Sequence, residues 1–268
     1  MKKIALLLMM ALAIVSCKKN DDDGTTTPQN VTVDFNFTQN WDGAPIANAD
    51  FDVSQYTTAN NEVLSLSKLV YLISDITFKD TNGMEYDAGD YKLVKVREGD
   101  LTFTPDIELP QGTYTVSFTF GFDDEDNNLN HPDLNSPSAD GSWNVPLMLG
   151  GGYHYMRMEG KYINPNVDPM IVNFQYHTIR ANKHSYLPPD ANSLEFIEDT
   201  SFKVNLGQII IGENTTIEVK MNVAEWFKNP NTWDLTMFYQ SLMPNYTAQI
   251  MMHENGQNGV FSLGEVTQ

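Results

Sequence analysis

Apolar and polar side chains alternate along most of the chain after residue 30. Between residues 31 and 38, valine and phenylalanine alternate with threonine, aspartate and asparagine, and residues 114–120 repeat the pattern after a Pro-Gln-Gly turn. A period of two residues predicts strands that bury one face. We expect further strands at 64–78, 91–96, 153–163, 171–179, 201–211 and 216–222.

The segments between the predicted strands are rich in Asn, Asp, Gly and Pro, and no helix-length crossover recurs among them. This pattern predicts an all-β fold, an antiparallel β-sandwich or barrel-like domain that spans residues 31–268. Apolar residues at mixed spacing in 223–227 and 232–242, on either side of Pro230, indicate short C-terminal connecting helices. A last strand is expected near 260–263.

The start of the chain has the pattern of a bacterial lipoprotein signal. Lys2 and Lys3 precede an apolar run over 4–15, which is too short to span a bilayer, and Cys17 follows Ser16. We expect residues 1–16 to be a signal peptide that is cleaved before Cys17, which would leave this cysteine for lipidation. The alternative is an ordinary secreted protein with a spare cysteine.

Residues 17–30 have almost no large apolar side chain to bury and are expected to form a flexible tether. A lysine followed by acidic residues resembles the signal by which Bacteroidetes export lipoproteins to the cell surface, although Asn20 interrupts it. We therefore expect a lipid-anchored protein of the outer membrane at the cell surface, with the periplasmic face as the alternative.

Composition narrows the classes of partner and chemistry. The formal net charge of -19 predicts repulsion from nucleic acid, so the membrane is expected to be reached through the lipid anchor. The only cysteine excludes an internal disulfide. No nucleophile elbow, P-loop, dinucleotide fingerprint or zinc-protease helix is present, so a protein that is not an enzyme is expected.

Two loops carry candidate chemistry. The acidic run 123–130 offers oxygen atoms suited to calcium, but Leu129 and Asn135 stand where an EF-hand loop needs glycine and a bidentate glutamate. A solvated acidic loop is the alternative to a calcium site. In the long irregular segment 121–143, His131 is either a functional residue or an ordinary loop histidine.

Softer metal ligands gather on two predicted strands. In a strand over 153–160, His154, Met156 and Met158 would share one face, and imidazole together with thioether groups favours copper. Residues 164–169 predict a hairpin that brings His177 opposite Arg157 or one of its neighbours, and a register shift of one residue would reverse the faces. On spacing alone, the competing interpretation is that both methionines belong to the core.

Several segments are similar to a known family. They are the strand 69–76, the Gly-Thr-Tyr turn within 109–114, Asn130-His131, the Gly-Tyr strand 152–160 that ends in Glu-Gly, and the aromatic-then-histidine strand 174–177. Together they resemble the MbnP-like family of bacterial copper-binding proteins.

The resemblance implies a β-sandwich-like exported protein with a mononuclear copper site built from histidines. In some members a tryptophan beside the copper is oxidised to kynurenine by a partner haem enzyme of the peroxidase type. His131 and His177 match the family by motif, and His154 is a further candidate. The tryptophans expected before the Gly-Tyr strand are missing from 146–151, and Trp143 is the nearest indole.

Two functions follow as expectations. The first is a lipid-anchored, non-enzymatic, copper-binding protein of the MbnP-like type, with His131, His154, His177, Met156 and Met158 as candidate ligands. The alternative is a surface interaction or glycan-binding lipoprotein that uses Trp41, Trp143 and Trp233.

Overall fold

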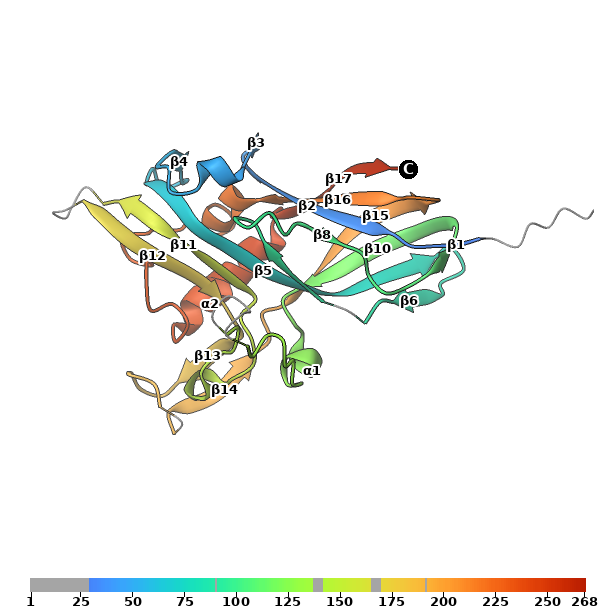
Figure 1. The fold of residues 1–268 in the computed structure, drawn as a ribbon. Coiled ribbons are helices and arrows are strands. Elements are labelled where there is room, and N and C mark those ends of the chain that lie inside the picture. Colours follow the sequence, from blue (N-terminus) through green and yellow to red (C-terminus); the bar gives the residue numbers. More distant parts are fainter. Residues whose placement is uncertain (1–28, 90, 137–141, 165–169, 191) are drawn as a thin grey trace, which may run out of the picture.

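A computed structural model describes residues 29–89, 91–136, 142–164, 170–190 and 192–268. Within these residues the fold consists mostly of antiparallel sheets, which confirms the all-β prediction (Figure 1). The predicted signal peptide, Cys17 and nearly all of the tether lie outside the described residues. No helix in the described part of the chain is both long and apolar enough to span a membrane.

The larger sheet is built around one long strand. Within the described chain it has 8 strands, in the order β12-β11-β5-β10-β15, with β4, β6 and β7 also paired to β5. Its strands are β4 (Tyr56–Thr57), β5 (Val63–Asp80), β6 (Glu85–Asp87), β7 (Lys92–Lys95), β10 (Gly112–Phe120), β11 (Met156–Ile163), β12 (Ile171–Thr178) and β15 (Phe202–Ile211).

The second sheet covers the inner face of the first. It has the order β17-β16-β2-β3, with β8 paired to β2. Its strands are β2 (Asp34–Trp41), β3 (Ala44–Pro45), β8 (Thr102–Phe103), β16 (Thr216–Asn222) and β17 (Phe261–Thr267). The pair β2 and β16 is parallel, with Thr216 opposite Asp34, whereas the other strand pairs are antiparallel.

Smaller elements complete the described chain. Two further pairs of strands are β1 (Asn30–Val31) with β9 (Leu109–Pro110), and β13 (Ala181–His184) with β14 (Leu194–Glu198). The helices are α1 (Asp124–Asn127), α2 (Tyr246–Gln257) and the 3-10 turns η1 (Asn48–Asp50), η2 (Leu147–Leu149) and η3 (Val223–Phe227).

The alternating pattern that predicted the strands also forms the core. In β2 every second side chain is buried, and Phe35 and Phe37 contact aromatic rings of β5 across the two sheets. The ring centroid of Phe35 is 6.1 Å from that of Phe78, and the centroid of Phe37 is 6.4 Å from that of Tyr71. The hydrophobic effect of this burial therefore holds the sheets face to face.

The prediction of short C-terminal helices is confirmed for 223–227 and wrong for 232–242. Residues 223–227 form η3 as expected, but 232–242 are not helical, and the longer helix is α2. The backbone of 232–242 is irregular, yet Trp233, Leu235 and Leu242 are buried. The indole nitrogen of Trp233 donates to the carbonyl oxygen of Phe238. Helix α2 begins where the Asn245 side chain accepts a hydrogen bond from the Ala248 N–H.

Candidate metal centre

The pairing of β11 with β12 places His177 beside two charged side chains. His177 lies opposite Arg157 in the antiparallel register, as the predicted hairpin requires, and Met158 lies opposite Tyr176. Residues directly opposite each other share a face of the sheet, and so do residues two apart on one strand. His177, Arg157 and Glu159 therefore lie together on the outer face of the larger sheet.

His154 reaches the same place from outside the regular strand. Strand β11 begins only at Met156, and the N–H of His154 donates to the carbonyl oxygen of Trp143 at 3.0 Å. The imidazole centroid of His154 is 5.5 Å from that of His177, with the rings nearly perpendicular at 83°. The structure thus brings these two candidate histidines into contact.

The methionines are on the other side of the sheet. Met156 and Met158 are fully buried members of the main hydrophobic core, and they pair with Tyr71 and Leu69 of β5. The expectation that they share a face with His154 is wrong, because the alternation holds only from Met156 onward and His154 precedes the strand. Their burial agrees with the competing interpretation that they are core residues.

Each imidazole of the pair is held through one nitrogen. His177 Nε2 is 2.8 Å from Glu159 Oε1, and His154 Nδ1 is 2.9 Å from the Trp143 carbonyl oxygen. Glu159 accepts, so Nε2 of His177 carries a proton. Nδ1 of His154 lies next to both an acceptor, the Trp143 carbonyl oxygen, and a donor, Arg157 Nη2, which is 3.3 Å away. Within the described residues no hydrogen bond engages Nε2 of His154 or Nδ1 of His177.

Burial keeps the His154 ring neutral. His154 is buried, and desolvation of the charged form, assisted by the Arg157 guanidinium, lowers its pKa to about 3. On the other ring, the hydrogen bond from His177 is the main reason that the pKa of Glu159 is lowered, so this carboxylate stays ionised. At neutral pH the His154 ring is therefore in the form that binds metals.

Arg157 and Trp143 form one wall of this centre. The guanidinium of Arg157 lies 4.7 Å from the Trp143 ring and donates from Nη2 to the Ser142 carbonyl oxygen at 2.6 Å. Trp143 is fully buried, its ring centroid is 5.7 Å from that of His154, and its indole nitrogen has no hydrogen-bond partner in the described structure. Trp143 therefore contacts His154 in two ways, through its indole ring and through its carbonyl oxygen.

His131 is placed in a separate aromatic cluster. Its ring stacks on Phe122 with a centroid distance of 4.4 Å, and its Nε2 donates to the Asp126 carbonyl oxygen at 3.0 Å. Its backbone N–H donates to the Tyr153 hydroxyl, next in sequence to His154. In the described chain no group of three or more His, Cys, Asp or Glu side chains is arranged to hold a metal ion.

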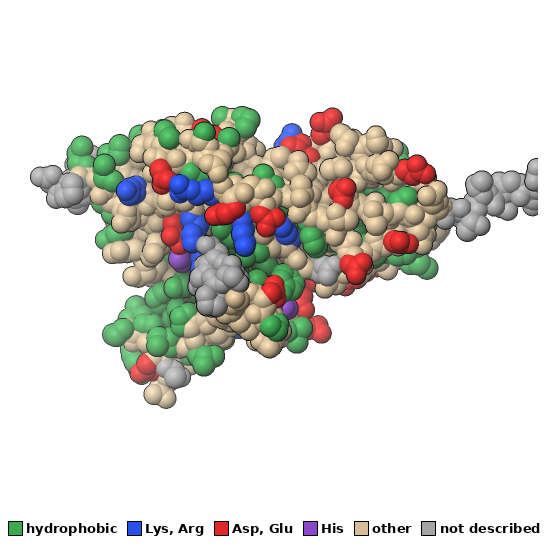
Figure 2. All heavy atoms as spheres, viewed as in Figure 1, with side chains coloured by type: hydrophobic (Ala, Val, Ile, Leu, Met, Phe, Trp, Pro, Cys, Tyr) green, Lys and Arg blue, Asp and Glu red, His purple; other side chains and the backbone are tan. Residues whose placement is uncertain are grey.

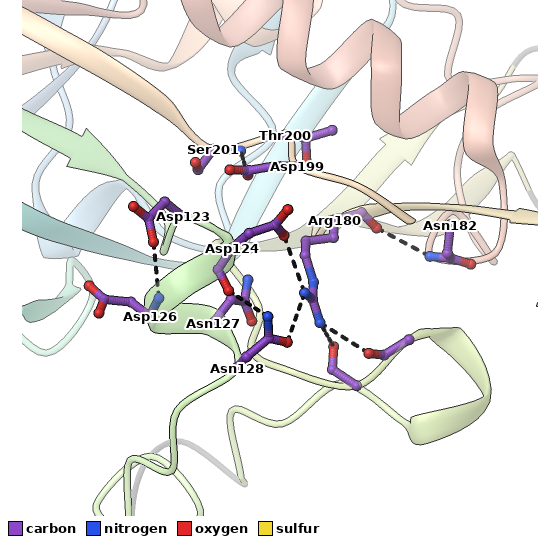
Figure 3. Close-up of polar contacts among 12 residues, drawn as sticks. Asp123, Asp124, Asp126, Asn127, Asn128, Arg180, Asn182, Asp199, Thr200 and Ser201 are labelled. Carbon is purple, nitrogen blue, oxygen red and sulfur yellow. Dashed lines mark hydrogen bonds and ion pairs between the residues drawn. The ribbon is translucent and has the colours of Figure 1, made fainter. Parts of the chain in front are cut away.

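The acidic loop fastens the backbone that carries His154. Asp123 caps α1, and Asp124 Oδ1 is 3.3 Å from Arg180 Nη1 (Figure 3). Arg180 Nη2 also donates to the carbonyl oxygens of Gly150 and Gly151. These uses of the acidic side chains agree with the alternative to a calcium site.

The sequence did not reveal the roles of Arg180 and Asn127, which both contact the backbone near Gly152. The Asn127 side chain accepts a hydrogen bond from the Tyr153 N–H at 2.8 Å, and a Cβ atom at Gly152 would collide with it. Gly152 has φ of +79°, which glycine adopts without strain. The Gly-Gly-Gly run 150–152 was the signal in the sequence that the backbone approaches other groups closely here.

The three tryptophans of the glycan-binding alternative are buried. Trp143 and Trp233 are 0% exposed and Trp41 is 8% exposed. A sugar-stacking platform needs an open ring face, so these residues do not provide one. The expectation that these tryptophans lie in exposed loops is therefore wrong, whereas the tether that also suggested this alternative lies outside the described residues.

The comparisons place the chain in a family. A family model described as MbnP matches residues 30–250. The chain belongs to the MbnP family. Its structure is similar to MbnP from Methylosinus trichosporium, with a TM-score of 0.46 and 14% sequence identity over 76% of this chain and 79% of that chain. A search of curated proteins gave no match. The matched region includes His131, His154 and His177.

A carboxylate close to this region provides a test of the local electrostatics. Burial, the Asp75 carboxylate and the Asp123 carboxylate raise the pKa of Asp126 to about 6. A raised carboxyl pKa gives stability that is present at low pH and lost as the pH rises through 6. We expect Asp126→Asn to raise the thermal unfolding midpoint at pH 8 and to have little effect at pH 4.

The control for this measurement is Glu195→Gln, which removes a carboxylate from an exposed position of β14. Circular dichroism melts at both pH values give the comparison. If Asp126→Asn stabilises no more than the control at pH 8, the carboxylates around Asp126 do not repel it in the folded protein.

Proposed function

We propose that this member of the MbnP family is a lipid-anchored, non-enzymatic copper-binding protein in which His154 and His177 are the metal-binding pair. The observation that carries the proposal is the contact between these two rings, each of which has one ring nitrogen without a hydrogen-bond partner in the described chain. Family membership supports copper as the metal, because the chain resembles copper-binding proteins in the strands that carry both residues.

The separation of the rings suits a shared ion. A metal bound to imidazole lies about 2.0–2.1 Å from the nitrogen, which is about 3.2 Å from the ring centroid. Two rings on one ion are then about 5–6 Å apart at angles of about 100–140° between the two metal–nitrogen bonds, and about 6.4 Å apart at the angle of about 180° in linear two-coordinate Cu(I). The observed distance of 5.5 Å between the centroids falls in this range.

The donor set favours copper over the common alternatives. Structural zinc takes four ligands and magnesium takes six oxygen ligands, whereas Cu(I) accepts two or three soft or imidazole ligands. The described residues add no third His, Cys, Asp or Glu to form a metal-binding group with this pair. A site of two nitrogens therefore fits Cu(I) best.

The surrounding residues support metal binding by these rings. Glu159 accepts from His177 Nε2, which leaves the lone pair of His177 on Nδ1. For His154 the contact of Nδ1 with the Trp143 carbonyl oxygen, at 2.9 Å, is shorter than its contact with Arg157 Nη2, at 3.3 Å, and this favours the tautomer with the proton on Nδ1 and the lone pair on Nε2. Such partners orient the ligands and raise their basicity. When bound, copper would supply reversible one-electron chemistry or would be stored. His154 and His177 would hold it.

Titration with Cu(I) tests the proposed pair. The full chain is used with Cys17→Ser, because a free thiol would itself bind Cu(I). We expect His177→Ala and His154→Gln to weaken binding by more than about tenfold, because each removes one of two ligands, as competition with a chromophoric Cu(I) chelator will measure.

His253→Ala is the matched control, since this histidine is hydrogen-bonded to the Thr200 carbonyl oxygen on another element. Circular dichroism of each variant separates loss of a ligand from loss of the fold. The proposal fails if the parent protein binds no Cu(I), or if folded His177→Ala and His154→Gln bind it as the control does.

The anchor and location are part of the same proposal. We propose that Cys17 is lipidated and that the protein lies in the outer membrane at the cell surface. The described chain begins at β1, at the opposite end of the sandwich from β12 (Figure 1). An anchor before β1 would hold the His154–His177 pair away from the membrane. A haem partner of the peroxidase type stays a prediction of the family resemblance.

Membrane fractionation tests the anchor. We expect the native protein to sediment with outer membranes and to resist extraction by high salt, because acyl chains and not charge attach it. Cys17→Ala is expected to be released into the soluble fraction. Recovery of both proteins in the same fraction would contradict the anchor, and resistance of the native protein to external protease on intact cells would contradict the surface location.

A further inference from the structure

Basic side chains gather on one face of a strongly acidic protein. The full chain has a formal net charge of -19, yet Lys and Arg side chains lie close together across the middle of the face in Figure 2. We name this surface the basic strip, and it consists of Lys68, Lys95, Arg97, Arg157 and Lys161.

The strand register explains why these residues meet. Arg157 and Lys161 lie on one face of β11, and Val70 of β5 separates Arg157 from Lys95 of β7 in one row across the sheet. Lys68 lies opposite Glu159 in the next row. Neighbouring strands are about 4.8 Å apart, so the cations span a continuous patch on three strands.

Carboxylates neutralise only part of the strip. Arg97 Nη2 is 2.7 Å from Asp52 Oδ2, and Glu159 accepts the hydrogen bond from His177. Lys68 and Arg157 have interaction partners within the protein, and the charges of both act on the Glu159 carboxylate. Lys95 and Lys161 have no ion-pair partner in the described chain. Outside the strip, Lys79 pairs with Glu85 and Lys220 with Glu218.

A polar hollow adjoins the basic strip. It has a volume of about 300 Å³ and is lined by Ser67, Glu159, Gly160, Lys161, Asn173, Phe174, Gln175 and Gln240. Glu159 is the only acidic residue of this lining, and it accepts the hydrogen bond from His177. Amide and hydroxyl groups donate and accept hydrogen bonds, as a peptide backbone does. The surface therefore offers cations for carboxylates and neutral polar groups for main-chain amides.

We propose that the basic strip and its hollow dock an acidic polypeptide segment of a partner protein. Positive charge on this one face complements clustered Asp and Glu, and the amide-lined hollow suits a peptide. DNA carries one charge per about 1.7 Å, and the rest of this acidic protein would repel such a dense polyanion. The proposal goes beyond copper binding, because Lys68, Lys95 and Lys161 are not among the proposed ligands.

Docking on the strip would bring the partner beside the metal centre. Arg157 belongs to the strip and lies opposite His177 in the strand register. A bound acidic segment would therefore lie next to the imidazole pair, on the outer face of the same sheet. At physiological salt the Debye length is about 8 Å, so charges farther away than this are largely screened. The charges of the strip, and not the net charge of the protein, would therefore orient such a complex.

The experiment uses fluorescent poly-L-glutamate as the probe and the full chain with Cys17→Ser. The strip variant combines Lys68→Gln, Lys95→Gln and Lys161→Gln. The control variant combines Lys79→Gln, Lys203→Gln and Lys220→Gln, which lowers the positive charge equally at exposed positions outside the strip. Anisotropy measures binding at low salt and at about 150 mM salt.

We expect the strip variant to bind poly-L-glutamate at least about tenfold more weakly than the control variant. Because the strip attracts the probe by charge, we expect salt to weaken the same binding that the strip substitutions weaken. Equal loss in both variants, or no binding by the parent protein at low salt, would overturn the proposal. Tighter strip-dependent binding to phosphatidylglycerol vesicles than to poly-L-glutamate would also overturn it, in favour of a lipid surface. Cu(I) titration of the strip variant shows separately whether the metal proposal stands.

Discussion

The antiparallel register of β11 and β12 is the constraint on which the candidate site depends. It places His177 opposite Arg157 and next to Glu159, and it directs Met156 and Met158 into the core. A shift by one residue would exchange the two faces and bury the charged side chains. Burial of the methionines and Tyr176 therefore fixes where the imidazole can lie, so packing on one face determines chemistry on the other.

His154 depends on a second set of interactions, which lie outside the sheet. The chain enters β11 through Gly152, whose positive φ allows the close approach of Asn127, and Arg180 holds the carbonyl oxygens of Gly150 and Gly151. These contacts fix the loop backbone, from which the ring of His154 meets that of His177. The acidic loop contributes to the candidate metal centre by fixing the backbone that carries His154.

The sequence could predict the strands because burial on one face produces a period of two residues. It could also predict that His177 meets Arg157, since a short hairpin sets the register. It could not place His154, because the regular alternation begins only at Met156. The position of His154 is set by hydrogen bonds of the preceding loop to residues distant in the sequence. The helix α2 was missed because polar residues occupy part of its buried face: Gln249 and Asn255 are buried there beside Ala248 and Met252, so no apolar stripe marks the helix in the sequence.

The most direct test of the account is the ligand set of bound copper. X-ray absorption fine structure of the Cu(I)-loaded chain with Cys17→Ser should show two nitrogen scatterers at about 2.0 Å with the outer-shell pattern of imidazole. This result is expected because His154 and His177 are the proposed ligands, and among the described histidines their rings are in contact. A sulfur scatterer at about 2.3 Å would contradict the account, because it would place a methionine at the metal.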